Sequence, residues 1–203
     1  MDILKFSKSE SASIAKKTAH VLLRGELVVL PTDTVYGVMA IATDEAAVAK
    51  LYAAKKRDLK KPSAVLVYTL GTATDYLGNG SVTKLGQRFW PGPLTIVKES
   101  TKKIGGWSKI GVRIPDDDFL LKVLAQVKKP VMATSANISG EPAPINLDSV
   151  SSKVLEKTSL AVDKGRTALA EESTVVELSD SAPNILREGP ISLKQIKKVL
   201  ADG

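Results

Sequence analysis

The chain has 203 residues, of which 43% are hydrophobic and 25% charged, so it is long enough for a sizeable core and too apolar for general disorder. It has no cysteine and one histidine, His20, which excludes disulfides, thiolate chemistry and zinc sites built from these residues. The formal net charge of +7 favours anionic partners such as nucleotides or RNA. No secretory signal and no bilayer-long apolar run is visible, so we expect a cytoplasmic protein without a membrane partner.

The hydrophobic pattern predicts helices and strands that alternate from one end of the chain to the other. The first helix begins at a cap of Ser9 or Ser11 and ends near Arg24. A buried strand at 27–30 follows, and Asp44 caps the second helix. Residues 71–80 are expected to be loop with at most one short helix. Later helices are expected at 82–89, from a cap of Asp116 or Asp117 to about 127, and at 147–155 and 192–200. Later strands are expected at 64–68, 94–98, 110–114, 130–133, 159–163, 174–178 and 184–187. This mixture favours one α/β domain around a twisted, mixed sheet.

Three polar clusters each follow an apolar strand or helix. They lie at 32–34, 55–57 and 134–137, and Arg113 and Arg187 lie at or near the ends of further strands. Because the carboxyl ends of strands in open α/β sheets converge on one crevice, we expect these side chains to meet there. One lysine and three arginines, with hydroxyls and an amide, suit a nucleoside triphosphate bound together with a small carboxylate.

Each cluster also has a plain structural explanation. The side chains of the turn at 32–34 can simply hydrogen-bond to nearby backbone. The KKRDLKK run at 55–61 can be a solvated surface, and Arg113 can form an ion pair with a purely structural role. The sequence has no Walker loop, no GxGxxG fingerprint and no Ser–His–Asp set. Catalysis at such a site would therefore depend on positioning and charge neutralisation, which phosphoryl and nucleotidyl transfer tolerate.

Seven motifs, taken in order along nearly the whole chain, resemble the YrdC/TsaC family of threonylcarbamoyl-AMP synthases. They are PTDTVYG at 31–37, Lys55-x-Arg57, WPGPLT at 90–95, GVRIP at 111–115, TSANISG at 134–140, STVV at 173–176 and ILREG at 185–189. The resemblance is to the short form, a single YrdC-like domain over 1–203. It implies an open, twisted, mixed β-sheet with flanking helices and a positively charged cavity. It also implies a nucleotidyltransferase that makes threonylcarbamoyl-AMP and pyrophosphate from L-threonine, bicarbonate and ATP.

The resemblance further assigns roles to individual residues. The residues implied for L-threonine and bicarbonate are Thr32, Arg113, Ser135 and Ser173, with Arg113 on the threonine carboxylate. Those implied for ATP are Lys55, Arg57, Asn137 and Arg187, and those implied for catalysis are Lys55, Arg57, Ser135 and Asn137. No side chain of the protein is expected to bind a metal ion, and Mg²⁺ would enter the site bound to the phosphates of ATP. Replacing Arg113 with alanine is expected to raise the threonine KM without disturbing folding.

Five positions depart from the pattern usual in that family. They are Asp58, Lys61, Leu66, Lys109 and Ile145. The Lys-x-Arg and Ser-x-Asn pairs are intact.

The product would serve the modification of adenosine 37 in tRNA through downstream threonylcarbamoyl transfer proteins. Two other functions are compatible with the sequence. One is a YrdC-like scaffold that binds tRNA or double-stranded RNA by charge and shape. The other is a YciO-type paralogue without the synthase activity. The Ser135-x-Asn137 pair favours the synthase over the paralogue.

Overall fold

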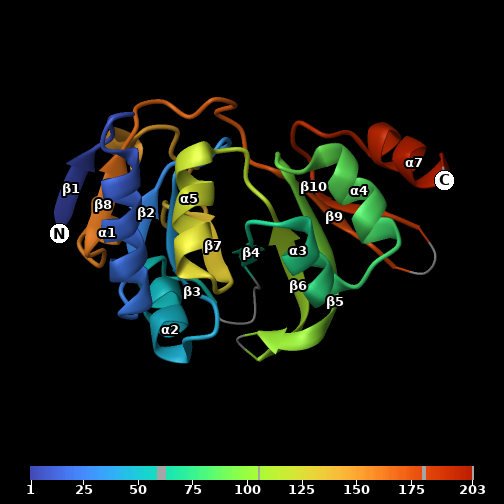
Figure 1. Ribbon diagram of the computed structural model, residues 1–203, viewed down its shortest axis with the longest axis horizontal. Helices are drawn as coiled ribbons and strands as arrows, with labels where there is room; N and C mark the ends of the chain where they lie inside the picture. Colours follow the sequence, from blue (N-terminus) through green and yellow to red (C-terminus); the bar gives the residue numbers. More distant parts are fainter. Residues whose placement is uncertain (59–62, 105, 180–181, 203) are drawn as a thin grey trace.

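The computed structural model describes residues 1–58, 63–104, 106–179 and 182–202, which form one ten-stranded sheet with flanking helices (Figure 1). The strands are β1 (Asp2–Lys5), β2 (Val28–Leu30), β3 (Gly37–Ile41), β4 (Ala64–Leu66), β5 (Leu94–Ile104), β6 (Trp107–Arg113), β7 (Val131–Ser135), β8 (Leu160–Asp163), β9 (Thr174–Glu177) and β10 (Asn184–Arg187). Their order in the sheet is β1-β8-β2-β3-β7-β4-β6-β5-β9-β10, with parallel and antiparallel neighbours. The expected open, mixed α/β sheet is confirmed.

Several of the helices begin where a capping side chain accepts a hydrogen bond from an early backbone N–H. They are α1 (Ser11–Leu23), α2 (Glu45–Ala54), α3 (Leu70–Leu77), α4 (Ser81–Phe89), α5 (Asp118–Val127), α6 (Ser152–Leu155) and α7 (Leu193–Ala201), with a 3-10 helix η1 (Leu147–Ser149). Asp44 caps α2 as predicted, and Asp117 caps α5 by accepting from the backbone N–H of Leu120 at 2.9 Å. The predicted first helix is confirmed as α1, but the predicted cap of Ser9 or Ser11 is wrong, because the N-cap is Glu10, which makes no side-chain capping bond.

Two strands, β1 and β3, were not expected from the sequence. β1 pairs in parallel with β8, so that Asp2 faces Leu160, and it forms one edge of the sheet. β3 lies between β2 and β7, and all five of its residues are buried. Neither strand shows the alternation of apolar and polar residues that marks a half-buried strand.

Alternate residues of the strands belong to two different cores, because successive side chains point to opposite faces of a sheet. Helices α1 and α5, which lie side by side in Figure 1, pack on one face of the N-terminal half, together with Val28 and Met39. Helices α2, α3 and α4 contribute to the other core, with Val65 and Val112. The face that α1 and α5 cover extends across β4, β6 and β5. The candidate site lies on this part of the face, which α1 and α5 leave uncovered.

The expectation that the polar clusters meet at the carboxyl ends of strands is only partly correct. The clusters at 32–34 and 134–137 lie at or just after the ends of β2 and β7. These two strands end at the same edge, since Leu30 and Ser135 both pair with Gly37, but Arg113 lies elsewhere. β6 runs parallel to β4, but β7 runs antiparallel to it. Arg113 at the end of β6 pairs with Leu66, whereas Leu66 faces Val131 at the start of β7. Ser135, at the end of β7, therefore lies towards the opposite end of the sheet from Arg113. The two side chains share a face of the sheet, not an edge.

Candidate functional site

A cavity of about 410 Å³ lies on this face of the sheet. Its lining comes from alternate residues of several strands, as the period of two requires. The basic side chains among the described lining residues are Arg57, Lys109, Arg113 and Arg187, and the one carboxylate among them is that of Glu172. This volume falls within the range of small-molecule sites in proteins. The charge of the lining suits an anionic ligand.

The floor of the cavity is built from residues with little or no side chain. Ala64 of β4 lies in register with Ala133 of β7 on one side and with Gly111 of β6 on the other. A Cβ atom at Gly111 would lie only 3.0 Å from Cγ2 of Thr95 and 3.3 Å from Cγ2 of Val97. The strip across these three strands is therefore open because the sequence places glycine and alanine there.

Arg113 is held at the cavity by three acceptors. Its Nε donates to the carbonyl oxygen of Gly92 at 3.0 Å, and Nη1 donates to Oγ1 of Thr34 at 3.0 Å. Nη2 donates to Oδ1 of Asp33 at 2.5 Å, within an ion pair. Burial raises the pKa of the Asp33 carboxyl, and the neighbouring Arg113 opposes that rise. The WPGP turn supplies the Gly92 carbonyl, and a Cβ at Gly92 would meet the Phe89 carbonyl oxygen.

The polar turn at 32–34 divides its side chains between two tasks. The Thr32 hydroxyl donates to the Val35 carbonyl at 2.8 Å and accepts from the Thr34 backbone N–H at 3.0 Å. This is the local bonding that the plain reading of the turn predicts. Asp33 and Thr34 instead accept hydrogen bonds from Arg113, so these bonds link the turn to the end of β6. Thr32 lines the cavity, but local backbone already engages its hydroxyl.

A second arginine is fixed across the cavity by β9 and the residues before it. Arg187 pairs with Glu172 at 2.5 Å and donates from Nη2 to Oγ of Ser173 at 3.0 Å. That hydroxyl also lies 2.9 Å from Oγ1 of Thr95. A Cβ at Gly189 would lie 2.5 Å from the Glu172 carbonyl oxygen, so the close approach of these segments requires glycine. The STVV and ILREG motifs therefore form one unit that positions Ser173 and Arg187.

Lys55 lies behind the cavity and not within its described lining. It is 1% exposed, and its Nζ donates to the carbonyl oxygen of Ser135 and, at 2.9 Å, to Oδ1 of Asn137. The Asn137 amide in turn donates to the carbonyl oxygen of Glu141. Lys55 and Asn137 therefore fix the segment that brings Ser135 to the cavity. Their predicted direct contact with ATP stays a prediction.

The buried ammonium of Lys55 gives a pH-dependent expectation. Burial, with Arg57 nearby, lowers the pKa of Lys55 from 10.5 to about 8. Activity should fall as the pH rises through about 8, because a neutral amine is a weaker donor to Ser135 and Asn137. From pH 8 to 10.5 the unfolded chain holds this proton and the folded protein does not, so Lys55 makes the free energy of unfolding rise with pH.

These opposite trends separate loss of activity from unfolding. Rates and urea unfolding curves measured from pH 7 to 10.5 should show both trends in the wild type, whereas both should be absent in Lys55→Met. Equal pH profiles for the two proteins would contradict the role of Lys55.

The predicted site residues divide into two groups. Those that line the cavity are Thr32, Arg57, Arg113, Ser135, Ser173 and Arg187. Lys55 and Asn137 form the second group, buried beside Ser135. The sequence did not single out Asp33, Thr34 or Glu172 as individual contacts, although the first two belong to the PTDTVYG motif.

The described residues that depart from the family pattern lie both in the cavity lining and away from it. Leu66 and Lys109 line the cavity, and Lys109 pairs with Glu177 at 2.7 Å. Ile145 lies apart from the cavity lining and accepts the backbone N–H of Thr167 at its carbonyl. Asp58 is exposed, and Lys61 lies outside the described residues.

The structure places the protein among α/β proteins with a mixed sheet and a basic cavity on one face. A family model for Sua5, YciO and YrdC, described as telomere recombination, matches residues 20–189. The chain belongs to the Sua5/YciO/YrdC family.

Several relatives are named threonylcarbamoyl-AMP synthases. The one from Pyrococcus abyssi is 34% identical over 192 residues, which cover 91% of this chain and 56% of the relative. A putative one from Methanocaldococcus jannaschii is 32% identical over 200 residues, which cover 97% of this chain and 95% of the relative. The chain thus spans little more than half of the first relative and nearly all of the second.

Solved structures show the same fold. P. abyssi Sua5 in complex with L-threonine superposes with a TM-score of 0.92 and 32% identity, over 100% of this chain and 62% of that one. Escherichia coli YciO gives a TM-score of 0.84 at 17% identity, over 96% of this chain and 98% of that one, which supports the fold alone.

Neither a membrane-spanning helix nor a cluster of metal ligands occurs among the described residues. No helix in this part of the chain has the length and hydrophobicity to span a membrane. Within the same residues, no group of three or more histidine, cysteine, aspartate or glutamate side chains is arranged to hold a metal ion.

Proposed function

We propose that the protein is a threonylcarbamoyl-AMP synthase, a nucleotidyltransferase that uses L-threonine, bicarbonate and ATP. The observation that carries the proposal is the cavity itself, in which Arg113 and Arg187 are fixed on one face of the sheet. Arginine forks match carboxylate and phosphate oxygens, so one cavity can bind an amino acid beside a triphosphate. The names of the relatives support the same activity.

In the proposed reaction, the threonine amine and bicarbonate form a carbamate and release water. A carbamate oxygen then forms a bond to the α-phosphorus of ATP. The bond from that phosphorus to the bridging oxygen breaks, and pyrophosphate leaves with both electrons. The protein would supply fixed cations for the charge that spreads onto the leaving group. Arg57 and Arg187 are suited to the phosphates, and Arg113 to the threonine carboxylate.

Mg²⁺ would enter on the phosphates of ATP as part of the substrate. The donor set of the cavity fits this, because its basic side chains outnumber the carboxylate of Glu172. Ser135 and Ser173 would add hydroxyl contacts to threonine. Transfer of the product to tRNA, and any direct binding of RNA, stay predictions.

Pyrophosphate release from ATP by the purified protein tests this function. L-Threonine and bicarbonate are each omitted in turn, and release should require both. Release that is indifferent to threonine, or no release from a folded protein, would contradict the synthase. RNA binding that needs no threonine and weakens steeply with salt would then favour the RNA-binding scaffold.

A further inference from the structure

The guanidinium of Arg113 has only part of its hydrogen-bonding capacity available to a ligand. Arginine carries five N–H donors, and the bonds to Gly92, Thr34 and Asp33 use three of them. Among the described residues, the second N–H of Nη1 and that of Nη2 have no acceptor, so both remain for an anion in the cavity. The direction of these two donors depends on how the other three are held.

Asp33 acts on Arg113 from outside the cavity. Thr34 and Arg113 belong to the described cavity lining, but Asp33 does not. Both members of the Asp33–Arg113 pair are nearly inaccessible, at 5% and 6% exposure. Asp33 therefore supports the guanidinium without occupying the space in which a substrate would bind.

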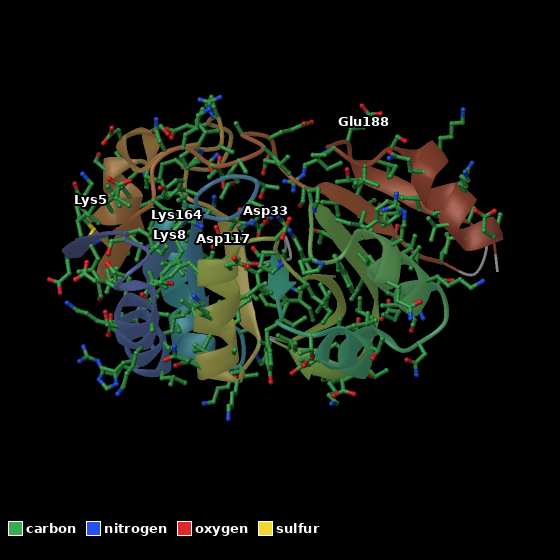
Figure 2. All side chains as sticks on the ribbon, turned by 45° about the horizontal axis from the view of Figure 1, so that its top comes forward. Lys5, Lys8, Asp33, Asp117, Lys164 and Glu188 are labelled. Carbon is green, nitrogen blue, oxygen red and sulfur yellow. The ribbon has the colours of Figure 1, made fainter. Side chains whose placement is uncertain are left out.

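The carboxylate of Asp33 is committed to Arg113. Its second oxygen, Oδ2, is buried and has no hydrogen-bond partner among the described residues. In Figure 2, Asp33 lies close to Asp117 and Lys164, but Lys164 pairs with Asp117 at 2.5 Å. In the described part of the chain, Arg113 is the cation that forms an ion pair with Asp33.

We infer that Asp33 is a positioning residue that aims the two remaining donors of Arg113 at the carboxylate of the amino-acid substrate. The inference rests on the proposed function, because that function supplies the carboxylate. Of the three acceptors, Asp33 makes the shortest bond and the only charged one, so it defines the plane of the guanidinium most strongly. A bidentate contact requires this plane to be correct.

The test compares binding of L-threonine and L-threoninol, which has an alcohol in place of the carboxylate. Asp33→Asn keeps the shape of the side chain and removes its charge. Calorimetry should show about a 10-fold weaker Kd for L-threonine in this variant, because a misaligned Arg113 would no longer form one of its charge-assisted hydrogen bonds to the substrate. Binding of L-threoninol should not change. A general structural defect would weaken both ligands and the binding of ATP.

Asp116→Asn is the matched control, because it removes an exposed carboxylate near Asp33 that forms neither a hydrogen bond nor an ion pair with Arg113. It should bind both ligands as the wild type does. If Asp33→Asn fails to fold, Asp33→Glu is the second variant, because it keeps the charge and shifts the carboxylate against Arg113, and it should weaken binding of L-threonine and leave that of L-threoninol unchanged.

The outcomes separate this inference from the proposed function. A folded wild type that binds no L-threonine would overturn the proposed function. A wild type that binds L-threonine, with Asp33→Asn binding it equally well, would overturn the positioning role alone. Tighter binding of L-threonine by the variant would also overturn it, because Asp33 would then compete with the substrate.

Discussion

Replacing Arg113 with methionine is expected to lower the free energy of unfolding by about 3–5 kcal/mol. The change removes the cation that pairs with Asp33 and leaves that carboxylate buried, with Oδ2 already lacking a partner. For a chain of this length, the melting temperature should fall by about 10 °C. Urea unfolding of the two proteins at pH 7 measures the difference.

The double variant Asp33→Asn/Arg113→Met is the control, because it removes both charges together. It should recover most of the lost stability and still fail to bind L-threonine. Equal stability of the single and double variants would show that the buried charge is not the cause. The sequence alone suggested that folding would survive the loss of Arg113, and the buried pair changes that expectation.

Gly111→Val is expected to reduce turnover in the proposed synthase reaction by about 100-fold or more, because the new side chain would occupy the floor of the cavity. The first added atom already lies 3.0 Å from Thr95, and the two methyl groups of valine extend further into the cavity. Crowding against Thr95 and Val97 should lower the free energy of unfolding by about 1–3 kcal/mol, offset in part because valine favours extended backbone over glycine. Steady-state rates and melting temperatures distinguish the two effects.

The same substitution at Gly71 provides the comparison. Gly71 is exposed in α3, and the nearest atom to a Cβ there is 4.0 Å away. Gly71→Val should retain wild-type turnover, and Gly111→Ala should lie between the wild type and Gly111→Val. Full activity of Gly111→Val would mean that substrates do not use this strip of the sheet.

The parts of the fold that depend on local patterns could be predicted from the sequence. The helix caps at Asp44 and Asp117 are examples, because each uses a side chain three residues from its partner N–H. β1 could not be predicted in this way, since its partner β8 lies near the other end of the chain. β3 was not predicted because all of its residues are buried, so apolar and polar residues do not alternate, and because its first residue is a glycine.

The candidate site shows the same limit. Motif order identified most residues that line the cavity, but the turn at 32–34 gave no means of separating its three side chains. The contact between Asp33 and Arg113 spans 80 positions in the chain, and no spacing rule detects it. Lys55 has a strongly basic sequence context, yet tertiary packing buries it against Ser135. Charge patterns indicate the kind of ligand better than they indicate which side chains reach it.

The pairing of β1 with β8 has a consequence for the order in which the protein can fold. β8 also pairs with β2, so residues 160–163 join two strands from the beginning of the chain. On the ribosome, β2 can pair early with β3, but β1 and the other edge of β2 must wait until most of the chain has been synthesised. Such long-range pairing makes folding slow, and the unpaired strands stay open to wrong partners meanwhile. The N-terminal end of the sheet is thus the part whose assembly depends most on protection during synthesis.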